Sequence, residues 1–169
     1  ELSHQSKQKP EELFRHLRAA AESGWDFSSR WFKDVKSFAT IHTTDIIPVD
    51  LNCLLHHLEQ TLAEAYQLAG NSLKSAAYQS LSRKRKIAIK KYCWSDEKNF
   101  FFDFDFVANR QKEQVTLAAA FPLFFEIASP DQAMAIAKLF EEKFLKPGGM
   151  TTTLEHSGQQ WDAPNGWAP

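Results

Sequence analysis

The feature that most limits how this chain can fold is a long run of apolar residues at helical spacing in its first half. These side chains recur at steps of three and four residues, which places them on one face of a single helix. Pro48 suits the first turn of this helix, and Gly70 suits its end. Either Asn71 or Ser72 then caps a second helix that runs to about Tyr92. The run consists of Leu51, Leu54, Leu55, Leu58, Leu62, Ala65 and Tyr66.

Two helices joined by so short a turn form an antiparallel αα-hairpin, and the sequence favours a second one further along. Residues 114–128 and 131–144 have apolar helical patterns and meet at a Ser-Pro hinge. A short helix is also expected over residues 11–21, and the Pro-Gly-Gly run at residues 147–149 breaks the chain. These patterns predict an all-α toroid or solenoid in one domain.

Between the two helix pairs the period of the pattern changes. Residues 102–106 read FDFDF, and such strict alternation is typical of a short strand. With Trp94 and the polar turn at residues 95–99, this strand is expected to form a small β-hairpin. Asp103 and Asp105 would share one face of the strand, and we interpret that face as solvent-exposed rather than as a calcium site.

Charge and hydropathy argue against several classes of partner. The net charge is −1, so no general basic surface favours nucleic acid. The basic run at residues 83–86 (RKRK) is interpreted as a solvated outer helix face. No stretch reaches the roughly 18 apolar residues of a membrane-spanning helix. We also expect no metal site, because Cys53 and His57 share a helix face but two ligands do not make a structural zinc site.

Residues 24–31 read GWDFSSRW and place a carboxyl group between aromatic rings. Apolar surroundings favour the protonated form of a carboxyl group, so Asp26 is a candidate general acid, and Gly24 would let a ligand approach the backbone. Alternatively, Asp26 caps a short helical turn. Glu22 lies four residues earlier and is a weaker candidate for a retaining pair with Asp26, because Gly24 interrupts the helix between them.

A second aromatic motif occupies residues 158–169, which read GQQWDAPNGWAP. Aromatic rings stack on the C–H faces of sugars, while amide and carboxylate groups bond sugar hydroxyls. The motif is therefore either a sugar-binding loop or a packed loop around a Pro-Asn-Gly turn.

Together these motifs carry a family resemblance. Residues 160–169 resemble the second signature of the trehalases of glycoside hydrolase family 37, and residues 24–31 are similar to the segment that carries that family's general acid. Residues 43–52 (TTDIIPVDLN) and 147–149 also look like family sequence. The resemblance covers essentially the whole chain, with the motifs in the same order. The residues of these motifs resemble bacterial periplasmic trehalases more than cytoplasmic ones.

The resemblance implies an all-α fold that is part of an (α/α)6 barrel, with a short β-hairpin between helix pairs. Residues 1–169 would be an internal portion of one catalytic domain, truncated at both ends. The implied reaction is hydrolysis of α,α-trehalose to two glucose molecules with inversion, without metal or cofactor, in a protein that is monomeric at full length. Asp26 would be the general acid. The implied substrate-binding residues are Gly24, Trp25, Gln160, Trp161 and Asp162.

Three family features have no counterpart in the chain: the first signature, an Arg-Pro-Glu segment and the glutamate general base. An inverting glycosidase needs that base, so we expect this stretch alone to be inactive. We also expect it to be poorly folded, because the neighbouring helices of the implied barrel would be missing at both ends. A non-catalytic α/α-toroid carbohydrate-binding module is the alternative function, and a helical scaffold that binds protein is a third.

Overall fold

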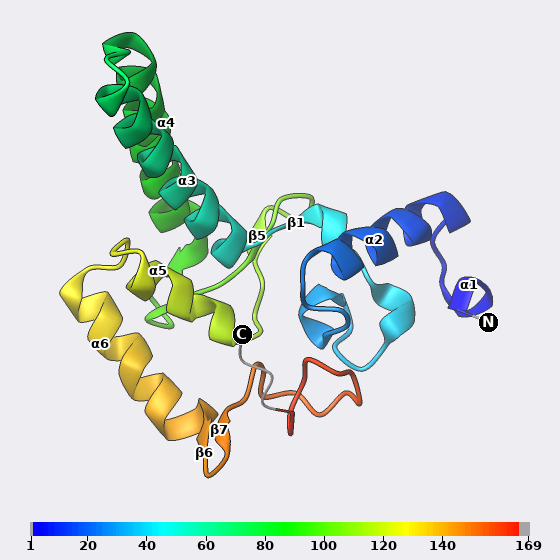
Figure 1. Ribbon diagram of the computed structural model, residues 1–169. Helices are drawn as coiled ribbons and strands as arrows, with labels where there is room; N and C mark the ends of the chain where they lie inside the picture. Colours follow the sequence, from blue (N-terminus) through cyan, green and yellow to red (C-terminus); the bar gives the residue numbers. More distant parts are fainter. Residues whose placement is uncertain (1, 166–169) are drawn as a thin grey trace.

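The computed structural model describes residues 2–165, and its regular structure is mainly helical (Figure 1). The longer helices are α2 (Pro10–Glu22), α3 (Val49–Leu68), α4 (Ser72–Cys93) and α6 (Pro130–Leu139), while α1 (Leu2–Gln5) and α5 (Phe121–Phe124) are single turns. This confirms the all-α class. The helices of residues 2–165 do not close into a barrel by themselves. None of the helices in the described residues is long and apolar enough to cross a membrane.

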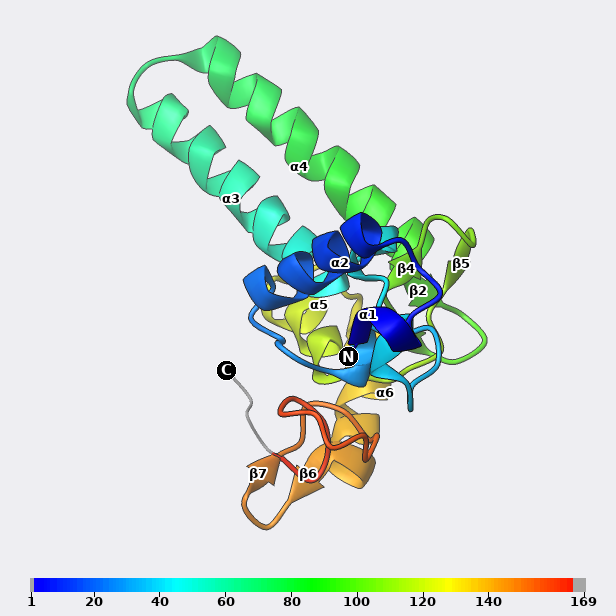
Figure 2. The same ribbon diagram turned by 90° about the vertical axis from the view of Figure 1, so that its right-hand side faces the viewer.

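Helices α3 and α4 form the predicted αα-hairpin, which projects from the rest of the molecule (Figure 2). Pro48 directly precedes α3. Gly70, with a φ of 73°, lies in the turn that follows the end of α3. Of the two predicted caps for α4, Asn71 is the one used, because its side chain accepts a hydrogen bond from the Lys74 amide. The Tyr66 and Tyr78 rings stack across the two helices near the tip.

The second predicted hairpin is wrong in its first half. Residues 114–128 contain only the 3₁₀ turn η4 (Leu117–Ala120) followed by α5. A proline fits only the first turn of a helix, so Pro122 prevents a longer helix from running through this segment. The second half is helical as predicted: Ser129 and Gln132 form a capping box for α6, which continues as a π-helical turn, η5 (Phe140–Phe144).

The predicted β-hairpin is present, but its strands are shorter than expected. β2 (Trp94–Ser95) pairs antiparallel with β3 (Phe100–Phe101). The alternating segment then divides, because β4 (Phe104–Asp105) pairs instead with β1 (Ile46–Ile47) and β5 (Arg110–Gln111). The Pro-Gly-Gly break lies at a further hairpin of β6 (Leu145–Lys146) and β7 (Gly149–Met150).

The solvent-exposed face predicted for Asp103 and Asp105 is also wrong, because both side chains are buried. For Asp103 the physical reason is an arginine from elsewhere in the chain, Arg30, whose guanidinium group donates to its carboxylate. The Asp105 carboxylate instead accepts from the backbone amides of Val107 and Ala108. A buried carboxylate is tolerated where a cation and hydrogen-bond donors compensate its lost hydration.

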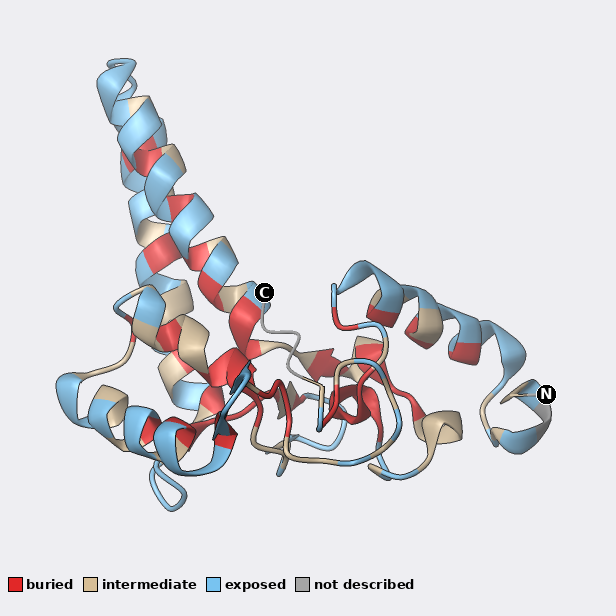
Figure 3. Cartoon of the chain, turned by 60° about the horizontal axis from the view of Figure 1, so that its bottom comes forward, coloured by how far each residue is buried: buried red, intermediate tan, exposed pale blue. Residues whose placement is uncertain are grey.

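The buried residues gather in the body of the molecule, below the projecting hairpin, where α2, the short strands and several turns converge (Figure 3). Three 3₁₀ turns, η1 (Ser29–Trp31), η2 (Phe38–Thr40) and η3 (Thr43–Asp45), carry the chain through this region. Aromatic rings fill much of the core, which includes Trp31, Phe32, Phe100, Phe101, Phe102 and Phe144.

The basic run of α4 is only partly the solvated face that the sequence predicted. Arg83 and Lys84 are exposed, but Arg85 forms an ion pair with Glu59 of α3, and Lys86 donates to the backbone carbonyl of Glu126. Half of the run therefore holds the hairpin together and fastens it to the body.

Candidate functional site

The GWDFSSRW motif forms a loop that leads from the end of α2 into η1. Trp25 points inward with 5% of its surface exposed, whereas Asp26 is exposed, so Asp26 lacks the apolar surroundings that the sequence predicted for it. Asp26 is also not the cap of the turn. The Arg30 amide donates to Ser28 Oγ, and the Ser29 amide donates to Asp162.

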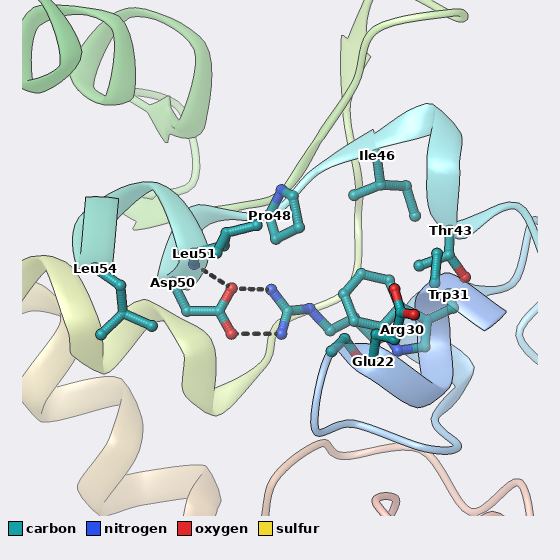
Figure 4. A pocket seen from close by; sticks show the side chains of 11 residues that line it. Glu22, Arg30, Trp31, Thr43, Ile46, Pro48, Asp50, Leu51 and Leu54 are labelled. Carbon is teal, nitrogen blue, oxygen red and sulfur yellow. Dashed lines mark hydrogen bonds and ion pairs between the residues drawn. The ribbon is translucent and has the colours of Figure 1, made fainter. Parts of the chain in front are cut away.

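Arg30 lies at the centre of this region and is almost completely buried. Its guanidinium group donates at 2.8 Å to both oxygens of Asp50, at the start of α3, and at 2.7 and 2.8 Å to both oxygens of Asp103. Figure 4 shows the two parallel bonds to Asp50. The guanidinium carbon also lies 4.5 Å from the ring centroids of Trp25 and Trp31.

The charges of this network stabilise one another. Burial alone disfavours a charged guanidinium, but the carboxylates of Asp103 and Asp50 outweigh it and raise the pKa of Arg30. Burial alone would likewise raise the pKa of Asp50, but the ion pair with Arg30 outweighs it and holds that pKa below its usual value. The network therefore stays charged and ties the aromatic loop to α3 and to the strands.

Two cavities adjoin this network. One of about 500 Å³ is lined by Arg30, Trp31 and Asp50 together with Glu22 and Leu54 (Figure 4). The other, of about 510 Å³, is almost wholly apolar and is lined by Trp25, Leu54, Leu117, Ala120, Phe121, Phe124, Phe125 and Met150. Trp25 thus contacts Arg30 on its ring face and also forms part of an apolar wall.

The second aromatic motif meets the first in space. The Trp161 amide donates to the Phe27 carbonyl at 3.1 Å, and the rings of Trp161 and Trp25 have centroids 5.9 Å apart. Gln160 is exposed, and its carbonyl accepts from Asn165. The last four residues of the motif, 166–169, lie outside the described residues. The two motifs that the sequence singled out are therefore in direct contact.

Asp162 is buried completely beneath this contact. Its carboxylate accepts from Ser28 Oγ and the Ser29 amide, each at 2.8 Å, and from Thr153 Oγ1 at 2.9 Å. Ser157 Oγ donates to it as well. Both oxygens of the Asp162 carboxylate are thus engaged within the protein rather than directed to the surface.

Sequence reasoning did not identify Arg30, Asp50 and Asp103 as parts of the site. A usable signal existed: all three are charged residues inside otherwise apolar or aromatic segments. Charged residues in such positions are rarely left unpaired, so a cation in one segment predicts an anion in another.

A separate cavity of about 310 Å³ lies beside β5, and its polar lining residues include His42, Asp105, Arg110 and Lys112. Lys112 Nζ donates to the Phe32 carbonyl at 2.6 Å and lies 3.0 Å from His42 Nε2. Burial lowers the pKa of Lys112 to about 8.

Neither cysteine in residues 2–165 is arranged as a metal ligand. Burial raises the pKa of the Cys53 thiol to about 12 and raises that of Cys93 as well, so both thiols are neutral. The described residues contain no group of three or more His, Cys, Asp or Glu side chains that could hold a metal ion.

The chain resembles proteins of known activity over nearly its whole length. It is 48% identical over 158 residues to proteins named periplasmic trehalase from Salmonella paratyphi A and Salmonella enteritidis PT4, which covers 94% of this chain and 28% of each relative. The chain therefore spans about 28% of the length of these curated relatives.

Solved structures agree with this at the level of the fold. The neutral trehalase of Saccharomyces cerevisiae matches with a TM-score of 0.77 and 25% identity, over 93% of this chain and 31% of that one. A mannosylglycerate hydrolase of glycoside hydrolase family 63 from Thermus thermophilus, solved with glucose, matches with a TM-score of 0.55 over 65% of this chain and 27% of that one. At 19% identity, this second match shows a shared fold only. The trehalase family model matches residues 1–169, and the chain belongs to the trehalase family.

Proposed function

We propose that the protein containing this chain hydrolyses α,α-trehalose to two glucose molecules with inversion, and that residues 1–169 are an internal portion of its single catalytic domain. One observation carries the proposal: the two aromatic motifs, far apart in the sequence, meet directly beside Asp26, where the Trp161 amide bonds the Phe27 carbonyl. The family membership and the trehalase relatives support the choice of substrate.

In this proposal Asp26 is the general acid that protonates the oxygen between the two glucose units. Its exposed position leaves the carboxyl group accessible to a bound sugar. An inverting enzyme needs a second carboxylate about 6.5–9.5 Å away, with a water molecule between that base and the sugar. We expect this base to come from outside residues 1–169.

The proposed substrate contacts surround Asp26. Gly24 has a φ of 77°, and a β-carbon built there would meet nothing within 4 Å, so its backbone is open to a ligand. Trp161 would offer apolar surface to a sugar ring, Trp25 would do so only with the part of its ring that lines the apolar cavity, and the exposed Gln160 would bond hydroxyl groups. We propose no metal or cofactor for the reaction.

We further propose that the protein works in the bacterial periplasm as a monomer, in accord with relatives that are named periplasmic trehalases. Cell fractionation with an antibody, followed by sedimentation of the purified protein, tests both statements. Recovery with the cytoplasmic fraction, or a stable dimer, would contradict them.

The catalytic assignment is tested by Asp26→Asn in the complete gene product that carries this chain. Loss of a general acid typically costs about 10²–10⁴-fold in rate, so glucose release from trehalose should fall by at least that range. The melting temperature should stay unchanged, because Asp26 is exposed. Asp34→Asn, an exposed aspartate in the following loop, is the matched control and should retain full activity.

Near-normal turnover by the Asp26→Asn protein would exclude Asp26 as the acid. A protein that binds trehalose but releases no glucose even without the substitution would favour the alternative function, a non-catalytic carbohydrate-binding module.

A further inference from the structure

Four hydrogen-bond donors converge on the Asp162 carboxylate, and they come from two distant parts of the chain. Thr153 and Ser157 belong to the segment that leads into the second aromatic motif. Ser28 and the Ser29 amide belong to the first motif, immediately after Phe27. Asp162 is 0% exposed, so these bonds are shielded from water.

The bonds fix the backbone that carries Asp26. The Phe27 carbonyl accepts from the Trp161 amide, and the next two residues both donate to Asp162. The Thr152 hydroxyl in turn donates to the Trp161 carbonyl, which holds the second motif from its other side. The backbone of residues 27–29, directly after Asp26, is thereby held between a backbone bond and a buried carboxylate.

We infer that Asp162 is a positioning residue for Asp26 and not a ligand of the sugar. It acts through Ser28 and Ser29, setting where the Asp26 carboxyl group meets the oxygen between the two sugar rings. This inference rests on the proposed function, because it takes Asp26 to be the general acid.

A carboxylate suits this task better than an amide. All four groups around Asp162 donate, and a carboxylate has acceptor sites only. Asparagine would keep one accepting oxygen but turn an N–H₂ group toward at least one of the donors. The Asp162→Asn protein should therefore keep the shape of the side chain while loosening the loop that carries Asp26.

The leaving group of the substrate distinguishes positioning from binding. Glucose leaves trehalose only when its oxygen is protonated, so trehalose hydrolysis depends on the acid. In α-glucosyl fluoride the C–F bond breaks as water bonds to the same carbon, and fluoride departs without protonation by a general acid. A displaced acid therefore slows trehalose hydrolysis selectively, whereas a lost sugar contact weakens both substrates.

The experiment compares both substrates in the complete gene product with Asp162→Asn and with Ser28→Ala. Because misplacing a catalytic group by about 1 Å can cost about 10²-fold, we expect Asp162→Asn to lower kcat for trehalose by about 10–100-fold, with KM changed less than about threefold. Turnover of α-glucosyl fluoride should change by less than about threefold. Ser28→Ala should also slow trehalose hydrolysis selectively, but with a smaller loss of kcat than Asp162→Asn.

Ser82→Ala is the matched control, because Ser82 is also a buried serine whose hydroxyl has one side-chain partner, His56, but it lies between α3 and α4. Ser82→Ala should leave the turnover of both substrates unchanged. Equal losses on trehalose and fluoride, or a raised KM with unchanged kcat, would overturn the inference. If Asp162→Asn does not fold, Ser28→Ala and Thr153→Ala decide by the same comparison.

Failure of the proposed function gives a different result. Asp26→Asn should lose trehalose hydrolysis and keep fluoride hydrolysis. If it keeps both, the assignment of the acid is wrong and the inference falls with it. If Asp26→Asn is selective and the Asp162 and Ser28 variants are not, only the positioning role is excluded.

Discussion

His42 is a buried residue whose two ring nitrogens face groups of opposite charge. Its Nε2 lies 3.0 Å from Lys112 Nζ, while its Nδ1 lies 3.6 Å from the Asp105 carboxylate and 3.7 Å from that of Asp45. The pKa of His42 is lowered to about 3, chiefly by burial and next by the nearby charge of Lys112. The folded protein therefore keeps this ring neutral at pH values where the unfolded chain would protonate it.

This difference predicts that His42→Gln makes the protein less sensitive to acid. Between about pH 6.5 and 3 the unfolded chain binds a proton at His42 that the folded protein does not. The free energy of unfolding therefore declines as the pH falls through that window, by up to about 1.4 kcal/mol per pH unit. Glutamine does not titrate, so the drop in melting temperature from pH 7 to pH 5 should be smaller by about 1–2 degrees in a protein of the relatives' length.

Calorimetry of the complete gene product measures the effect. His156→Gln, at an exposed histidine, serves as the control and should follow the unsubstituted protein. An acid dependence that His42→Gln leaves unaltered would mean that His42 is protonated in the fold.

At the scale of elements, the α3–α4 hairpin shows what sequence reasoning captures well. Helix α3 follows from apolar spacing, and the turn and the start of α4 follow from Gly70 and the Asn71 cap, all of which are local. The partners of Arg85 are not local: its guanidinium donates to both oxygens of Glu59 at 2.7–3.1 Å and to the side chain of Asn52 at 2.9 Å. A count of basic residues on one helix does not show which of them face the other helix.

We expect Arg85→Ala to destabilise the protein by about 1.5–3 kcal/mol, because hydrogen bonds to charged groups contribute in that range and Glu59 would be left buried without its cation. Arg83→Ala, at an exposed position on the same helix, should change stability by less than about 0.5 kcal/mol. Urea unfolding followed by circular dichroism compares the two. Similar midpoints for both variants would mean that the Arg85 pair contributes no stability.

At the scale of the whole molecule, Arg30 connects the first motif to α3 and to the strands, and Asp162 connects it to the second motif. The motifs themselves were recognisable from the sequence, because an unusual run of aromatic and polar residues is local information. The contact between the two motifs in the folded chain was not recognisable in this way. The partners of Arg30 lie 20 and 73 residues away, and neither spacing follows a helix or strand period.

The network makes a prediction about stability. Asp103→Asn removes one of the two carboxylates that balance a fully buried guanidinium, and breaking a buried pair typically costs about 3–5 kcal/mol. Asp131→Asn, at an exposed position, is the control with the same chemical change and should cost less than about 0.5 kcal/mol. Denaturant titrations give both values, and a loss for Asp103→Asn no larger than the control would show that Arg30 is balanced by Asp50 alone.

The distance along the chain between Ser28 and Asp162, 134 residues, also has a consequence during synthesis. A ribosome adds about 5–20 residues per second, so the loop that carries Asp26 emerges roughly 7–27 seconds before the carboxylate of Asp162. The α3–α4 hairpin, whose contacts are local, has time to form in that interval. The loop around Asp26 cannot complete its contacts in that interval. Ser28 and Ser29 stay hydrated until Asp162, near the end of this stretch, has been synthesised.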